Sequence, residues 1–163
     1  MKENKVIIYT TNDGKTKIDV KLEEETLWLT QAQMCELYQT SKSNVSEHIK
    51  RIFEEEELTK EATVRKFRIV QMEGSRNVER EVEHYNLDMI IALGYRIRSI
   101  IATRFRQWAT ERLKEYIIKG FTLDDERLKK LGGGSYWKEL LERIRDIRAT
   151  EKIEKFTALV NSF

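Results

Sequence analysis

The side chains best suited to chemistry gather in one polar segment, Gln31–Lys50, with the sequence QAQMCELYQTSKSNVSEHIK. At the start of an expected second helix, hydroxyl and amide side chains stand close to two lysines. Such groups hydrogen-bond to base edges and phosphates, and the ammonium groups add positive charge. Asn44 is the strongest candidate for reading a base, because its amide can form two hydrogen bonds with adenine. The exposed side of this helix is expected to carry Lys42, Ser43, Asn44, Ser46, Glu47 and Lys50.

The spacing around these residues predicts two helices joined by a tight turn. Cys35 is small, which lets a second helix cross closely, and Tyr38 is an apolar residue just before the polar turn Gln39–Ser41. The second helix has two apolar anchors, Val45 and Ile49. Gln39 departs from the pattern, because glycine is common at that position. The segment therefore predicts a helix-turn-helix that binds duplex DNA. A plain helical hairpin with a solvated polar face is the alternative, since such spacing often arises by chance.

A second concentration of positive charge lies between Tyr95 and Lys119. Seven Arg and Lys residues minus two Glu residues give +5 there, more than the +2 of the whole chain. Contacts with several phosphates would release counterions and make binding strongly salt-dependent. The arginines predicted to contact DNA are Arg96, Arg98, Arg104 and Arg106. The alternative is that they pair with the glutamate-rich stretches and only solubilise the helix.

No pattern indicates catalysis, a cofactor or a small-molecule substrate, and we expect a protein that is not an enzyme. The soft metal ligands Cys35, His48 and His84 stand in different predicted elements without paired spacing, so no metal site is expected. Cys35 is expected to be a small core residue, and His48 a surface or hydrogen-bonded histidine that could also touch DNA. The segment LKKLGGGS lacks the phosphate-loop pattern, and no Gly-x-Ser-x-Gly elbow is present. A solvated acidic face, not a nuclease metal site, is expected at Glu54–Glu57, Glu61 and Asp88.

Composition narrows the class of protein further. The chain has 163 residues, 40% of them hydrophobic and 36% charged, which is typical of a globular fold with a heavily solvated surface. A single cysteine excludes an intramolecular disulfide and favours a reducing compartment. No apolar run approaches the roughly 20 residues that span a bilayer, and no secretory signal is evident. We therefore expect a cytoplasmic protein without a membrane partner.

Periodicity predicts an α+β fold with two β-hairpins. In the first, Lys5–Tyr9 and Lys17–Leu22 flank Asn12–Gly14, and in the second, Thr63–Met72 and Asn77–Tyr85 flank a turn at Glu73–Arg76. Thr30 and Gln33 form a capping box at the start of the first helix of the Gln31–Lys50 segment.

Three helices and a helical tail are predicted after the second hairpin. A buried helix, Leu87–Leu93, is expected to end at Gly94, and a long amphipathic helix at Gly120. The apolar face of that long helix comprises Ile101, Phe105, Trp108, Ala109, Leu113, Tyr116 and Ile117. Thr122 with Asp125 is expected to cap a short helix that stops at the linker Gly132–Gly134. Helical spacing then continues at Trp137, Leu140, Ile144 and Ile147 and, after a slip in phase, at Ile153, Phe156, Val160 and Phe163.

Two domains follow from this organisation. Residues 1–121 would form the hairpin and helix-turn-helix DNA-binding domain. Residues 122–163 would form a helical extension, through which the chain could form a homo-oligomer or bind a protein partner.

Four blocks resemble the RhuM family of virulence-associated bacterial proteins: residues 26–50, 84–99, 103–121 and 124–148, with RFRQWATERLKEYIIKGF the most specific. The arrangement is also similar to Bro-N and antirepressor domains of phages and large DNA viruses, which implies DNA binding. RhuM-like chains generally continue past RIRDIR, whereas this one turns into KIEKFTALVNSF, so the resemblance implies a shortened C-terminus.

Three hypotheses of function follow. The first is a sequence-specific DNA-binding regulator linked to a mobile or virulence-associated locus. The second is an antirepressor-like module that captures another regulator through the Trp137–Ile147 stripe, and the third is a toxin or nuclease acting on nucleic acid.

Overall fold

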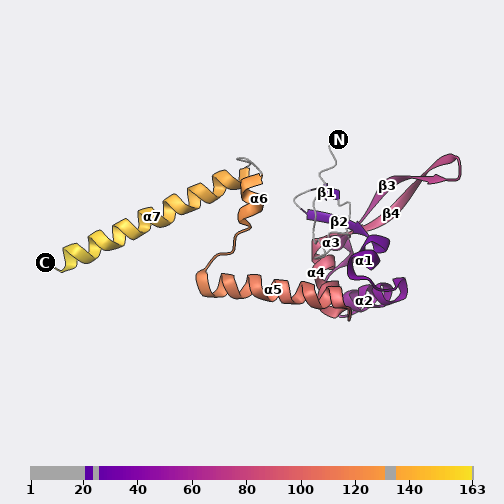
Figure 1. The fold of residues 1–163 in the computed structure, drawn as a ribbon, viewed down its shortest axis with the longest axis horizontal. Helices are drawn as coiled ribbons and strands as arrows, with labels where there is room; N and C mark the ends of the chain where they lie inside the picture. The colour runs from indigo at the N-terminus through magenta and orange to yellow at the C-terminus, as the bar shows by residue number, and fades with distance from the viewer. Residues whose placement is uncertain (1–20, 24–25, 131–134, 163) are drawn as a thin grey trace. The chain divides into compact units, whose positions relative to one another are not determined.

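The structure, a computed structural model, describes residues 21–23, 26–130 and 135–162 (Figure 1). The first predicted hairpin lies almost wholly outside these residues, as do the glycines 132–134 and Phe163. The described elements form an α+β fold, as predicted. In chain order they are β1 (Lys21–Glu23), β2 (Thr26–Thr30), α1 (Gln31–Tyr38), α2 (Lys42–Glu54), α3 (Lys60–Thr63), β3 (Val64–Glu73), β4 (Arg76–Tyr85), α4 (Leu87–Arg96), α5 (Ile100–Lys119), α6 (Asp125–Lys130) and α7 (Ser135–Asn161).

The strands form an antiparallel sheet in the order β1-β2-β4-β3. The predicted second hairpin is confirmed: β3 and β4 pair along their whole length, from Val64 opposite Tyr85 to Glu73 opposite Arg76. Gly74 takes a positive φ of 63° in the two-residue turn, a conformation that glycine adopts without a steric penalty. Strand β2 was missed from the sequence. The strand has only five residues, and the last of them, Thr30, is also the cap of α1. So short a segment shows too little alternation of polar and apolar side chains to indicate a strand.

The hydrophobic core joins the sheet to the helices α1, α2 and α4. Strand β2 supplies Leu27 and Leu29, and the end of β4 supplies Tyr85. Burying these side chains together removes a continuous apolar surface from water, which is the main stabilising contribution to such a fold. The helices contribute Met34, Leu37, Tyr38, Val45, Ile49, Ile52, Met89, Ile90, Ala92 and Leu93, followed by Ile97 and Ala102.

Contacts group the described residues into two units, one up to Arg112 and one from Leu113 onward. The predicted domain boundary after residue 121 stays a prediction. In the first unit, the start of α5 packs on the core through Ile101, Ala102 and Phe105. The predicted long helix is confirmed, but most of its apolar face is not buried. Trp108 is 55% exposed and Ile117 71%.

Two predicted helix ends differ in the structure. Helix α4 does not stop at Gly94 but continues to Arg96, and Gly94 lies buried within its last turn. A Cβ atom at Gly94 would lie 2.4 Å from the ring of Phe105, so close packing, not a cap, explains the glycine. Helix α6 is capped by the preceding residue, Asp124, whose carboxylate accepts the backbone N–H of Arg127 at 3.0 Å. The hydroxyl of Thr122 instead donates to Glu115.

Candidate nucleic-acid interface

The start of α1 is held by a capping box, as the sequence predicts. The Gln33 backbone N–H donates to the Thr30 hydroxyl at 3.2 Å, and the Thr30 backbone N–H donates to the Gln33 side chain at 2.9 Å. These two bonds satisfy N–H groups that have no partner within the helix. Because Thr30 is also the last residue of β2, the box joins α1 rigidly to the sheet.

A tight turn sets the angle between α1 and α2. Gln39 adopts a left-handed conformation, with φ 50° and ψ 55°, which explains why glycine is common at such positions. The Thr40 N–H returns to the Cys35 carbonyl at 3.0 Å, and the Ser41 hydroxyl caps α2 by accepting the Asn44 N–H at 3.2 Å. Three apolar residues predicted to anchor the helix pair are buried: Tyr38, Val45 and Ile49.

The predicted contact residues of α2, which we call the α2 polar face, are Lys42, Ser43, Asn44, Ser46, Glu47 and Lys50. All are exposed except Asn44, which is half-buried. The Asn44 amide donates to the Thr40 hydroxyl at 2.8 Å. Glu47 bonds Arg51 at 2.6 Å, and Lys50 lies 3.6 Å from Glu54. Exposed pairs of this kind are worth little energy and exchange readily for other partners.

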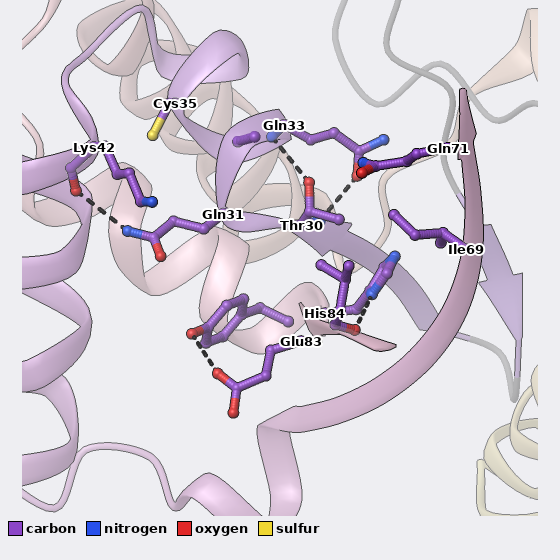
Figure 2. Close-up of a pocket in the computed structure, with 12 residues that line it drawn as sticks. Thr30, Gln31, Gln33, Cys35, Lys42, Ile69, Gln71, Glu83 and His84 are labelled. Atoms are coloured by element: carbon purple, nitrogen blue, oxygen red, sulfur yellow. Dashed lines mark hydrogen bonds between the residues drawn. The ribbon is translucent and has the colours of Figure 1, made fainter. Parts of the chain in front are cut away.

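A groove lies beside the start of α2. It has a volume of about 740 Å³ and is lined by the start of α1, by Lys42 and by the middle and base of the β3–β4 hairpin. Figure 2 shows Gln31 and Lys42 on one side and Ile69 and Gln71 across the opening. Gln31 donates to the backbone carbonyl of Lys42 at 3.2 Å and also to the Ser46 hydroxyl, so it joins α1 to α2. This role was missed from the sequence, where only the caps were considered.

The four predicted arginines divide into two pairs. Arg96 is the last residue of α4, and its guanidinium bonds Glu55 at 2.5 Å and Glu57 at 2.6 Å. Arg106 donates to the carbonyls of Gly94 and Ile97, each at 2.9 Å. The structure thus gives both side chains a role in holding the ends of α2, α4 and α5 together.

Arg98 and Arg104 are exposed, and they line a shared shallow groove of about 510 Å³. Within the described ranges, neither has an acidic partner. Arg98 follows Arg96 by two residues, and Arg96 contacts the segment just after α2. The two exposed arginines therefore lie near the C-terminal end of α2, whereas the 740 Å³ groove lies at its N-terminal end.

The cysteine and histidines occupy separate environments. Cys35 is partly buried against the core, and this burial raises the pKa of its thiol, which disfavours the reactive thiolate. The His84 ring packs on Phe67, and its Nδ1 lies 2.9 Å from the Val82 carbonyl. Among residues 26–130 and 136–162, no three His, Cys, Asp or Glu side chains gather as metal ligands would.

His48 lies on α2 between the polar face and the core. Its pKa is lowered, chiefly because partial burial disfavours the imidazolium form, and then because Arg51 and Arg96 lie nearby. Its Nδ1 atom is buried without a hydrogen-bond partner in the described part of the chain. The lowered pKa favours the neutral ring, which adds no positive charge to the surface of α2.

Comparisons with known proteins identify the family. The family model described as the Virulence protein RhuM family matches residues 62–159, more than half of the chain. The match begins after α2 and includes the β3–β4 hairpin and all four predicted arginines. No curated protein and no solved structure matches the chain. None of the helices in the described ranges is long and apolar enough to cross a membrane. The chain belongs to the Virulence protein RhuM family, a family associated with virulence.

Proposed function

We propose that this protein binds duplex DNA, with α2 in the major groove and the exposed arginines Arg98 and Arg104 on the phosphate backbone. The observation that carries the proposal is the α2 polar face. Short polar side chains are presented at the first turns of a helix whose opposite side is anchored by Val45, Ile49 and Ile52. A B-DNA major groove, about 12 Å wide, admits one such helix.

The charged side chains around α2 suit a negatively charged partner such as DNA, once the ion pairs within α2 are taken into account. Arg98, Arg104 and Lys42 have no acidic partner within the described residues, so their charges are available to phosphates without breaking an ion pair. Glu47 and Glu54 are each held by a basic side chain of the same helix. Non-specific affinity would then come from phosphate contacts and sequence preference from Asn44.

Selection of bound duplexes from a random pool, followed by fluorescence anisotropy over a range of salt, tests this function. We expect Asn44→Ala to change the preferred sequence at about one base pair, which typically costs 1–3 kcal/mol of discrimination. Arg104→Gln should weaken binding to all sequences alike and lower the salt slope by about 0.9.

Lys152→Gln is the matched control, because it removes one exposed positive charge from α7 and should leave both readouts unchanged. Unfolding curves check that each variant is folded. If wild type shows no affinity for any duplex, or Asn44→Ala and Arg104→Gln both bind like wild type, the assignment is wrong. We propose no catalytic step, so DNA incubated with the protein and magnesium should stay intact.

Protein binding through α7 is a second candidate, favoured by exposed apolar side chains. Trp137 is 41%, Ile144 43% and Ile147 68% exposed. Such a row of apolar side chains is typical of a helix that packs on another chain. A regulator that pairs through α7, or captures another regulator there, would use this surface.

Light scattering of wild type and of the double variant Trp137→Glu/Ile144→Glu separates the candidates. A dimer that the double variant abolishes supports an interaction role for α7. If wild type is a monomer and binds DNA with the same affinity as the double variant, α7 has no such interaction role.

A further inference from the structure

The β3–β4 hairpin extends far beyond the core that supports it. Each strand has ten residues, which at about 3.3 Å per residue gives a length of roughly 33 Å. Full burial is limited to the base, at His84 and Tyr85, whereas Val70 and Met72 are 63% and 76% exposed. Figure 1 shows the hairpin pointing away from α1, α2 and α4. Because a two-stranded ribbon alone is only marginally stable in water, its outer half would be stabilised by a further strand.

One edge of the hairpin is open to such a strand. Strand β3 is at the end of the order β1-β2-β4-β3, and in the described part of the chain it pairs with β4 alone. Edge strands are commonly blocked by proline, by a bulge or by charged side chains. Strand β3 has no proline, and its register with β4 is unbroken from Val64 to Glu73. Of these three features, only charge can therefore act here.

The charges of β3 are unequally divided along the strand. All its positive residues lie in the half nearer the core, at Arg65, Lys66 and Arg68. The outer half, Ile69–Met72, is uncharged, and Glu73 at its end is negative. Two parallel copies of β3 would place like charges opposite one another, which is destabilising. Two antiparallel copies would place the basic half of each strand opposite the uncharged and acidic half of the other, so the charges favour a second copy in this orientation.

One register of the two strands suits these charges best. Centred on Ile69, it places Arg65 opposite Glu73 of the second copy, at both ends of the paired segment. Residues 65–73 of each copy would then form the ladder. A register two residues closer to the base would be centred on Arg68 and would place this residue opposite itself, which like-charge repulsion disfavours.

The same register covers the exposed apolar side chains of β3. It places Lys66 opposite Met72 of the second copy and Arg68 opposite Val70. The methylene stems of lysine and arginine can lie along apolar side chains while their charged ends stay in water. Both exposed apolar residues of the outer half would thus lose contact with water without burial of a charge.

The groups that would form the end pairs can still bind one another. Arg80 bonds Oε1 of Glu73 at 2.5 Å, and a carboxylate has a second oxygen that accepts hydrogen bonds. The Arg65 guanidinium lies over the Trp28 ring, 5.0 Å from its centroid. This stacking uses the flat face of the guanidinium, whereas its N–H groups point outward along its edge.

We propose that two copies of the protein pair through β3, antiparallel and centred on Ile69, so that the two hairpins form one four-stranded sheet. Its strand order is β4-β3-β3-β4. The contact uses neither the α2 polar face nor the apolar side chains of α7. Since it does not depend on DNA binding, it is tested on the protein alone.

Cysteine cross-linking tests the register. Ile69→Cys is made in the full chain with Cys35→Ser and oxidised mildly. Residues directly opposite in an antiparallel pair have Cα atoms about 4.5–5.5 Å apart, which suits a disulfide. Val78→Cys in the same background is the matched control. Val78 lies on the same face of the hairpin but on β4, and two copies of β4 would be about 14 Å apart. We expect a covalent dimer from Ile69→Cys and none from Val78→Cys.

A charge substitution tests the strength of the contact. Val70→Lys adds a positive charge opposite Arg68 of the second copy, at a position 63% exposed in the single chain. Light scattering over a concentration series should show the dissociation constant of the dimer rise about tenfold, because symmetry repeats the like-charge pair. Asn77→Lys is the control, since it adds the same charge to the same face on β4, and should change the constant less than about threefold.

The outcomes separate this inference from the other proposals. Wild type that stays monomeric over the series, or cross-linking at Val78→Cys as fast as at Ile69→Cys, overturns it. A dimer kept in Val70→Lys but lost in Trp137→Glu/Ile144→Glu overturns it in favour of α7. If Ile69→Cys does not fold, the comparison of Val70→Lys with Asn77→Lys decides by itself. Pairing through β3 without affinity for any duplex overturns only the proposed DNA-binding function.

Discussion

The hydroxyl of Tyr38, the last residue of α1, donates a hydrogen bond to the backbone carbonyl of Ile90 in α4 at 2.5 Å. The two residues are 52 positions apart, and the Tyr38 side chain is buried. The bond links the helix that precedes the turn to the helix that follows the hairpin. The orientation of α2 thus depends on a contact outside the Gln31–Lys50 segment.

Tyr38→Phe should lower the free energy of unfolding by about 0.5–1.5 kcal/mol, because one buried hydrogen bond is lost while the ring is kept. Tyr38→Ala should cost about 3–5 kcal/mol, since it also leaves a large cavity. Urea unfolding followed by circular dichroism measures both. If both variants lost the same free energy of unfolding, the packing of the Tyr38 ring would contribute nothing beyond the hydrogen bond, contrary to this prediction.

Gln39→Gly should stabilise the protein by up to about 1 kcal/mol. Gln39 has a positive φ of 50°, a conformation that is strained for residues with a Cβ atom but not for glycine. Gln39→Val should destabilise it, since β-branched side chains tolerate this conformation least. Denaturant titration of the three proteins provides the comparison. A glycine variant less stable than wild type would show that the Gln39 side chain makes a compensating contact.

Gly94→Ala should lower the free energy of unfolding by about 1–3 kcal/mol, as overpacking in a core does. The added methyl would lie 2.4 Å from the Phe105 ring and 2.8 Å from the Tyr38 hydroxyl, so one of them must move. Phe105→Leu should recover part of the loss in the double variant, and a double-mutant cycle measures this coupling. Purely additive losses would mean that Phe105 is not the obstacle.

Glu55→Gln/Glu57→Gln should tighten binding to duplex DNA, because it removes two negative charges beside α2 and releases the Arg96 guanidinium that both carboxylates hold. The gain should shrink as salt rises, since exposed charges are screened. Anisotropy at low and high salt measures it. Glu126→Gln/Glu139→Gln, on α6 and α7, is the matched control and should have no effect.

Stability should fall as the pH is lowered from about 7 to 5, in part because of His48. Its pKa in the folded chain is lowered below the ordinary value of 6.5 by burial, with Arg51 and Arg96 acting in the same direction and Glu47 against them. At a pH between the two pKa values, His48 is protonated in the unfolded chain but neutral in the folded chain. Lowering the pH through this range therefore favours unfolding. His48→Gln should reduce the slope of unfolding free energy against pH in this range. An unchanged slope would exclude His48 as the cause.

Local sequence determined much of the secondary structure. The Thr30–Gln33 capping box and the Ser41 cap depend on residues three apart, and the β3–β4 hairpin depends on alternation around a two-residue turn. Interactions of such short range are visible in the order of residues alone. The exposed α2 polar face was predicted for the same reason, since Val45 and Ile49 mark the opposite side of the helix.

The features that depend on contacts between residues distant in the sequence were decided only by the tertiary structure. Strand β2 was not evident from its five residues, yet its pairing with β4 orients the hairpin relative to α1 and α2. Arg96 and Arg106 have the charge expected of DNA contacts, but carboxylates and backbone carbonyls distant in the sequence already bind them. Sequence determines which charges the chain carries. Their pairing depends on three-dimensional distance, and only the folded chain sets that distance.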